Sequence, residues 1–314
     1  MKNYTVYKNK RGKTFKQIIR NRWVYAMMLP VVIYFVMFRY VPIYYLRMVF
    51  YDYKILKGFE GSKFVGLEWF EKFFSSGNFG MLLKNTVMYS LGAVFLETLF
   101  PIIFALLINE VRNKRTKKVY QTLSFAPYFI STVIVVTMIN NVISPSVGVL
   151  NSFREMLGME SIYYLGDPKY FYVINYVSGV WSIMGWNAVV YISALSGVDS
   201  ALYEAAMVDG ASRWQRLIYI TIPSIKPTIA IMMILSIGKL VAGGNVEKLL
   251  LLQNDLNYSV SEMLNTYSYK LGIVDARYSY STAISFWTSC VSFILVLISN
   301  RIVNRMSDSD TNVF

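Results

Sequence analysis

Residues 204–223 read Glu-Ala-Ala-Met-Val-Asp-Gly-Ala-Ser-Arg-Trp-Gln-Arg-Leu-Ile-Tyr-Ile-Thr-Ile-Pro and lie between two long apolar stretches. Gly210, which follows Asp209, suits the left-handed residue that commonly closes a helix. Ser212 opens the sequence Ser-Arg-Trp-Gln, which fits the reciprocal capping box that begins a new helix. The stretch therefore predicts a short helix, a glycine turn and a second helix.

The first helix of this elbow, which we define as residues 200–223, has few bulky side chains. Asp199 and Ser200 can accept hydrogen bonds from free backbone donors, which predicts a helix start just after them. Ala205 and Ala206 expose almost no side-chain volume, so another protein could approach the backbone closely. On these cues alone, an ordinary loop between two spans is the alternative.

The composition predicts a membrane protein with several spans. The chain of 314 residues is 55% apolar and only 16% charged, whereas an ordinary soluble domain is nearer a quarter charged. A chain in lipid must satisfy its backbone polar groups within helices or a closed barrel, and a helix needs roughly 20 residues to cross the hydrocarbon. We expect an all-α fold with six spans, near residues 23–48, 83–109, 119–142, 171–195, 223–243 and 279–303.

Basic residues predict the orientation of these spans, because Lys and Arg concentrate in short cytosolic connections. Eight of the 31 basic residues fall within the first 22 positions, which carry no acid. The 110–118 connection holds five more, whereas the 49–82 and 143–170 connections are balanced or acidic. Both termini and the elbow are therefore expected in the cytosol. The first span lacks a cleavage site and is expected to be retained, not removed as a signal peptide.

Several kinds of chemistry are disfavoured by the residues present. Histidine is absent and Cys290 is the sole cysteine, so we expect no metal site, no disulfide framework and no enzyme active site. A phosphate-binding loop needs Gly, four residues, then Gly-Lys-Ser/Thr, and neither Gly12-Lys13 nor Gly238-Lys239 completes it. The net charge of +13 is expected to face anionic lipid and not nucleic acid.

The elbow also resembles a known family motif. Glu204-Ala205-Ala206, Gly210, Ile220 and Pro223 resemble the EAA loop of permease subunits in binding-protein-dependent ABC importers. The resemblance covers roughly residues 80–305. Within the family, the motifs are similar to those of the carbohydrate permease branch named for a lipoprotein-associated transport operon. Its further strings are Asn85-Thr86, Asn109-Glu110-Val111-Arg112, Gln121-Thr122, Ala126-Pro127-Tyr128-Phe129-Ile130-Ser131, Ser144-Pro145-Ser146 and Asn265-Thr266-Tyr267-Ser268-Tyr269.

The resemblance implies a domain organisation and a set of partners. It implies a basic cytosolic tail at 1–22, a first span with an external loop at 23–79, a permease core of five spans at 80–305 and a cytosolic tail at 306–314. It implies a second homologous permease, two cytosolic ATPase subunits that hold ATP and magnesium, and an extracellular lipid-anchored solute-binding protein. The cargo would be a carbohydrate, and the location the plasma membrane of a Gram-positive bacterium. This chain would bind no cofactor itself.

The elbow would be the coupling helix that enters a cleft of the ATPase. The resemblance implies that ATPase coupling involves Glu204, Ala205, Ala206, Asp209, Gly210, Arg213 and Pro223.

Polar and aromatic side chains within the spans are candidates for the substrate path, because such groups are expensive in lipid and usually face the bundle interior. The candidates are Asn140, Asn141, Trp181, Trp186, Asn187, Tyr191 and Lys239. Aromatic faces suit the CH surface of sugar rings, and amides can match hydroxyls. Helix packing or an interfacial aromatic belt is the alternative for these residues, and Lys239 can instead reach the headgroups.

Other functions remain open at this point. A secondary transporter driven by an ion gradient could use Glu97 as its coupling group, although that class normally shows two related halves. A structural acid beside Pro101 is the alternative for Glu97. A membrane enzyme or assembly factor, and an importer of peptides or polyamines, are further alternatives. The polar stretch at 244–278 is expected to be an external or partly re-entrant loop, with a short apolar patch at Leu249–Leu252.

Overall fold

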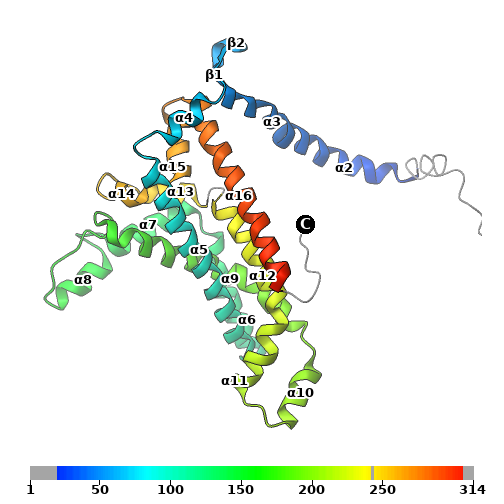
Figure 1. Ribbon diagram of the computed structural model, residues 1–314. Helices are drawn as coiled ribbons and strands as arrows, with labels where there is room; N and C mark the ends of the chain where they lie inside the picture. The colour runs from blue at the N-terminus through cyan, green and yellow to red at the C-terminus, as the bar shows by residue number, and fades with distance from the viewer. Residues whose placement is uncertain (1–19, 242–243, 307–314) are drawn as a thin grey trace, which may run out of the picture. The chain divides into compact units, whose positions relative to one another are not determined.

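The computed structural model describes residues 20–241 and 244–306, with the side chains of 239–241 and 302–306 left out. Most of the two predicted tails therefore lies outside the described residues. The chain divides into two units, residues 1–69 and 70–314 (Figure 1). Each unit is described by itself.

The first unit holds a long helical stretch followed by a hairpin. Its helical segments are α2 (Arg22–Phe35), η1 (Val36–Tyr40), α3 (Val41–Tyr45) and η2 (Leu46–Phe50). Together they match the first predicted span, and no residue of α2 is buried. The strands β1 (Tyr51–Lys54) and β2 (Gly58–Phe64) flank η3 (Ile55–Lys57) and pair antiparallel, an addition to the expected all-helical chain.

The regular elements described in the second unit are all helices. It is entered by α4 (Glu68–Phe74) and continues with α5 (Phe79–Asn109), α6 (Lys114–Phe125), η4 (Ala126–Phe129), α7 (Thr132–Ile143), α8 (Val149–Met156), α9 (Pro168–Ser196), α10 (Ser200–Val208), α11 (Arg213–Arg216), η5 (Leu217–Thr221), α12 (Ile222–Val241), α13 (Val246–Leu252), α14 (Tyr258–Ser261), α15 (Leu264–Tyr269), η6 (Lys270–Val274) and α16 (Tyr278–Met306). Figure 1 shows α10 and α11 at one end of this unit and α13 to α15 toward the other.

Four described helices are long and apolar enough to cross a membrane, or five if one bent pair is a single span. The four are Arg22–Phe50, Phe79–Asn109, Arg213–Gly238 and Tyr278–Arg301. The fourth predicted span corresponds to α9, which has 29 residues but is not among these four. Its Asn, Ser, Gly and Tyr residues make it more polar than the other spans.

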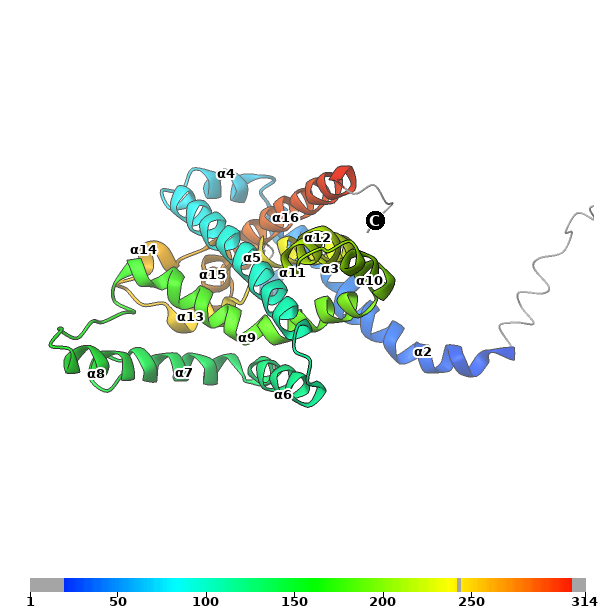
Figure 2. The ribbon, with the colours of Figure 1, turned by 90° about the horizontal axis from the view of Figure 1, so that it is seen from below.

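The third predicted span is the bent pair. The segments Lys114–Phe129 and Thr132–Ile143 meet at an angle of 101°, and α6, α7 and α8 follow one another along one edge of the bundle (Figure 2). Ile130 is extended and the Ser131 side chain accepts a hydrogen bond from the backbone nitrogen of Ile134. The chain therefore bends between Phe129 and Thr132, and it leaves the helix again after Ile143.

The centre of the second unit is the packing of α5 against α9. The Tyr176 hydroxyl of α9 lies 3.0 Å from the Met88 carbonyl oxygen and 3.3 Å from that of Tyr89, both on α5. The rings of Tyr89 and Tyr176 stack with centroids 5.7 Å apart. Gly92 permits this approach, since a Cβ there would lie 2.3 Å from the Tyr176 oxygen.

Two apolar clusters extend this packing. One joins Tyr89 and Ala93 of α5 to Phe171 of α9 and includes Leu249 and Leu252 of α13. Two residues of the apolar patch predicted at Leu249–Leu252 are therefore buried in the bundle, whereas Leu251 is 44% exposed. The other cluster lies nearer the elbow and consists of Ala105, Ala188, Tyr191, Leu195 and Ile225.

The contact at Gly92 predicts opposite effects of one substitution at two places in α5. Gly92→Ala forces a methyl group into the Tyr176 ring and should lower the free energy of unfolding by about 1–3 kcal/mol. Gly80→Ala, where nothing lies within 4 Å, should raise it by up to about 1 kcal/mol through helix propensity. Thermal unfolding of the detergent-purified protein measures both. Equal midpoints for the two variants would contradict this packing.

Candidate coupling elbow and translocation path

The first helix of the elbow has the predicted ends. The Asp199 carboxylate accepts a hydrogen bond of 2.9 Å from the Ala201 backbone nitrogen, and α10 begins at Ser200. Gly210 has φ +78°, and the Ala211 nitrogen donates to the Ala206 carbonyl at 2.8 Å. This is the left-handed closure expected of a helix that ends on glycine.

The second half of the elbow is continuous with a membrane span. Ser212 and Gln215 form the predicted capping box, with bonds of 2.7 and 3.3 Å. The helix then runs through the π turn η5 into α12, so the candidate span starts at Arg213 itself. The Tyr203 hydroxyl lies 3.0 Å from the Thr221 hydroxyl oxygen and joins α10 to η5. The elbow is therefore joined to the span by a continuous helix and by this hydroxyl contact.

Most of the residues expected to couple to an ATPase are exposed. No residue of α10 is buried, and the neighbouring Val208 is 89% exposed. Ala206 is half-buried. The other expected coupling residues are exposed, namely Glu204, Ala205, Asp209, Gly210, Arg213 and Pro223. Within the described chain nothing covers this surface.

The candidates for the substrate path are dispersed. Trp181 lines two apolar cavities of about 470 and 480 Å³. Trp186 stacks on Tyr128 with centroids 4.2 Å apart and rings 9° from parallel. Tyr191 is buried in the cluster beside Ala188. Trp186 and Tyr191 thus have packing partners, whereas Trp181 faces apolar space.

The remaining candidates include three amides. Asn140 and Asn141 are exposed on α7, and Asn187 is half-buried on α9. The Lys239 side chain lies outside the described residues. These candidates stay predictions.

Asn85 and Thr86, one of the motifs quoted above, bind residues just before the Asn265–Tyr269 motif, at the opposite end of α5 from the elbow. Asn85 donates hydrogen bonds of 2.9 and 3.0 Å to the Ser259 and Glu262 carbonyls. The Thr86 hydroxyl accepts a hydrogen bond of 3.0 Å from the Leu264 nitrogen. These contacts fix α14 and α15 to α5 across more than 170 residues of sequence.

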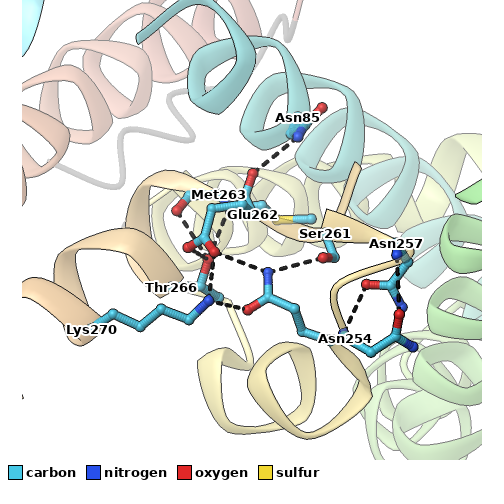
Figure 3. Close-up of polar contacts among 9 residues, drawn as sticks. Asn85, Asn254, Asn257, Ser261, Glu262, Met263, Thr266 and Lys270 are labelled. Carbon is cyan, nitrogen blue, oxygen red and sulfur yellow. Dashed lines mark hydrogen bonds and ion pairs between the residues drawn. The ribbon is translucent and has the colours of Figure 1, made fainter. Parts of the chain in front are cut away.

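Glu262 is the centre of this polar network (Figure 3). Its carboxylate is fully buried and accepts from the Lys270 ammonium at 2.6 Å. Thr266 and Gln253 donate to the same carboxylate at 2.9 and 3.1 Å. Burial, with the Glu262 charge adding, raises the pKa of the Tyr258 hydroxyl. The network satisfies a buried charge with an ion pair and hydrogen bonds, as burial requires.

Asn254 and Asn257 tie the same segment to the residues before α9. Both side-chain amides donate to the Leu165 carbonyl at 2.9 Å. Asn257 is fully buried and also donates to the Leu252 carbonyl at 3.0 Å. Asn254 and Asn257 therefore serve internal bonding, whereas Glu247, Asp255 and Asp275 of the same stretch are exposed.

Two side chains of opposite charge, Glu97 and Lys248, lie near Gly179 inside the bundle, and their proximity was not predicted from the sequence. The Lys248 ammonium of α13 is buried and donates to the Asn175 carbonyl at 2.8 Å. A Cβ at Gly179 would lie 2.9 Å from a Glu97 carboxylate oxygen and 3.7 Å from the Lys248 nitrogen. Glu97 therefore faces a buried cation. Absence of a side chain at Gly179 makes this arrangement possible.

A cavity of about 420 Å³ between α15 and α16 carries the other unpredicted polar surface. Its lining combines apolar surface with the hydroxyl groups of several Ser and Thr residues, the amide of Asn265 and the rings of Tyr269 and Tyr278. No charged side chain lines it among the described residues. Such a surface matches the hydroxyl groups and CH faces of a neutral polyol better than it matches an ion.

The described residues hold no group of three or more His, Cys, Asp or Glu that could bind a metal.

The elbow lies near one end of α5, and the segment bonded to Asn85 and Thr86 lies at the other end. The 24 residue steps from Asn85 to Asn109 correspond to about 36 Å of helix, which exceeds the ~30 Å of bilayer hydrocarbon. This part of α5 is therefore long enough to cross a membrane.

The ion pair in the network predicts an unequal effect of removing its two partners. Lys270→Met leaves the fully buried Glu262 carboxylate without its cation and should cost about 3 kcal/mol or more. Glu262→Gln leaves only Lys270, whose side chain is 36% exposed, and should cost about 1 kcal/mol. Thermal unfolding of both variants and of the double variant gives the comparison. A larger loss for Glu262→Gln would contradict the assigned burial.

The chain is similar to known transport proteins along most of its length. Residues 97–308 match the family of inner membrane components of binding-protein-dependent transport systems. The polygalacturonan/rhamnogalacturonan transport system permease protein YteP of Bacillus subtilis is 37% identical, with 96% of this chain and 94% of that protein covered. The protein LplB of the same species is 36% identical, with 91% and 90% covered.

Solved structures show the same fold. A chain from the crystal structure of a bacterial ABC transporter involved in the import of the acidic polysaccharide alginate superposes with a TM-score of 0.86 at 35% identity, over 94% of this chain and all of that chain. A chain from the alginate transporter in complex with a periplasmic protein bound to an alginate pentasaccharide gives 0.85 at 35% identity, over 94% and 98%. The predicted permease fold is confirmed. This chain belongs to the family of inner membrane components of binding-protein-dependent transport systems.

Proposed function

We propose that this chain is a permease subunit of an ATP-driven importer and forms half of a pore for an oligosaccharide. The observation that carries the proposal is similarity over more than nine-tenths of the chain to YteP and to the alginate importer permease. The exposed elbow, continuous with a span, supports the use of an external source of energy.

The cargo is an oligosaccharide from an acidic polysaccharide. Two of the similar proteins are named for polygalacturonan/rhamnogalacturonan and for alginate. The hydroxyl-lined cavity beside Asn265 offers hydrogen-bonding groups suited to the neutral parts of such a molecule. The dispersed candidates Trp181, Trp186 and Asn187 are predicted contacts at other positions along the path.

The partners are those that the family resemblance implies. A second homologous permease completes the pore, and two cytosolic ATPase subunits bind ATP and magnesium. A lipid-anchored binding protein delivers the cargo from outside, as the complex of the alginate transporter with its periplasmic protein supports. The complex lies in the plasma membrane of a Gram-positive bacterium. This chain carries out no chemical step and binds no cofactor.

The mechanism is alternating access driven through the elbow. When the ATPase subunits close, they carry Glu204, Ala205 and Ala206 with them. The helix from Arg213 to Gly238 follows, because the Tyr203–Thr221 contact attaches it to α10. The spans then open toward the binding protein, and ATP hydrolysis returns them to the inward-facing state.

Cargo identity is tested by competition in the reconstituted importer. Proteoliposomes containing this chain, its partner permease, the ATPase subunits and the binding protein should accumulate labelled oligogalacturonate or oligoalginate when ATP is inside. Excess unlabelled uronate oligosaccharides should reduce this accumulation, whereas peptides and polyamines should not. Accumulation of peptides or polyamines in place of glycans would remove the carbohydrate assignment but leave the ATP-driven mechanism intact.

The coupling role of the elbow is tested by the same substitution at two glycines that have similar left-handed backbone angles. Gly210 and Gly158 have φ +78° and +73°, and at both positions a Cβ would meet nothing within 4 Å. Gly210→Val should reduce uptake about tenfold or more while the ATPase still turns over, because the bend that seats α10 is lost. Gly158→Val carries a similar local cost of ~1–2 kcal/mol and should retain uptake. Equal uptake by the two variants, measured with ATPase activity, would contradict the coupling role.

A further inference from the structure

A hollow of about 370 Å³ lies between the end of α5 and the elbow. Arg112, Arg213 and Arg216 line it, together with Glu110. We call it the arginine hollow. Asn109 to Arg112 and the elbow are two of the strings quoted in the sequence analysis, and this hollow is where they meet.

The arginine hollow has an excess of positive charge that the described chain does not neutralise. Three guanidinium groups face one carboxylate, and none of them forms an ion pair with Glu110 within 4.0 Å among the described residues. The Arg216 Nε is buried and has no hydrogen-bond partner there. A buried donor without a partner is costly, so the site is built for an acceptor that the described residues do not provide.

Guanidinium chemistry indicates the kind of acceptor. Arginine presents a planar fork of donors that fits phosphate and carboxylate groups with paired hydrogen bonds. Glu110 lies at the same hollow and would repel an anion, but the excess of two positive charges remains after it is counted. The hollow therefore suits a group with one or two negative charges and several acceptor oxygens.

The position of the hollow distinguishes among such groups. One candidate span ends at Asn109 and another begins at Arg213, so both borders of the hollow mark the same surface of the membrane. This is the depth of the lipid headgroups. The exposed groups Glu204, Ala205 and Val208 of α10, which a cytosolic partner would meet, do not line the hollow, whereas the exposed Met207 and Arg213 do.

We propose that the arginine hollow binds the phosphate of an anionic phospholipid, which holds the elbow against the end of α5. The lipid is a specific ligand and not only part of the surrounding bilayer. Because Tyr203 and Thr221 also line the hollow, the headgroup lies beside the contact that joins α10 to its span. Its binding does not depend on the cargo or on ATP hydrolysis, so it can be tested apart from the proposed function.

The first test measures bound lipid on the complete importer purified in mild detergent. Arg112→Gln/Arg213→Gln/Arg216→Gln should lose the anionic phospholipid that native mass spectrometry detects on the wild type. Each charge-assisted hydrogen bond that is lost corresponds to about a tenfold or larger drop in affinity. The matched control is Lys114→Gln/Arg115→Gln/Lys118→Gln, which removes the same charge from exposed residues outside the hollow and should retain the lipid.

The second test measures ATPase activity in phosphatidylethanolamine vesicles with and without phosphatidylglycerol. Phosphatidylglycerol should stimulate the wild type and the control variant but not the hollow variant. Arg216→Lys, which keeps the charge without the fork, should need more phosphatidylglycerol and serves if the triple variant does not assemble. Equal lipid retention by the two triple variants would overturn the proposal. So would stimulation by inorganic phosphate alone, which indicates a free anion, or loss of the ATPase subunits with lipid retained, which indicates an acidic protein partner.

Discussion

The close packing of α5 against α9 is the contact on which the second unit depends. It requires an absent side chain at Gly92, where the Tyr176 hydroxyl meets the α5 backbone, and another at Gly179, where Glu97 and Lys248 approach. Close approach of backbones through small residues is a general means of helix association in membranes. With this pair fixed, α13 is held by Lys248 at one level and Ala105 packs with Tyr191 at another.

The two ends of α5 differ in how they contact their neighbours. At one end, Asn85 and Thr86 hold α14 and α15 by direct hydrogen bonds, which gives that side a firmly bonded segment. At the other end, α5 meets the elbow across the arginine hollow and not through a packed core. A transporter that alternates between two states needs one region that keeps its internal bonds and one that moves relative to its neighbours. The contrast between the bonded end and the open end of α5 fits that need.

Interactions between residues close together along the chain could be predicted from the sequence, whereas interactions between residues far apart along the chain could not. The ends of the elbow helices were predictable, because Asp199, Gly210 and Ser212 act on backbone groups within three residues. The Glu262 network was not, since the charge pattern of a polar stretch does not reveal whether its groups bond to one another. For the substrate path, Trp181 and Tyr191 were candidates because they are aromatic residues within predicted spans. Only the fold shows that Trp181 lines a cavity and that Tyr191 is buried.

The central claim is that force enters this chain through the elbow from a separate ATPase. The most direct measurement compares solute accumulation in proteoliposomes that hold this chain alone with proteoliposomes that hold the whole importer. The chain alone should accumulate no oligosaccharide under a proton or sodium gradient, whereas the whole importer should do so with ATP and without a gradient. Gradient-driven accumulation by this chain alone would contradict the account.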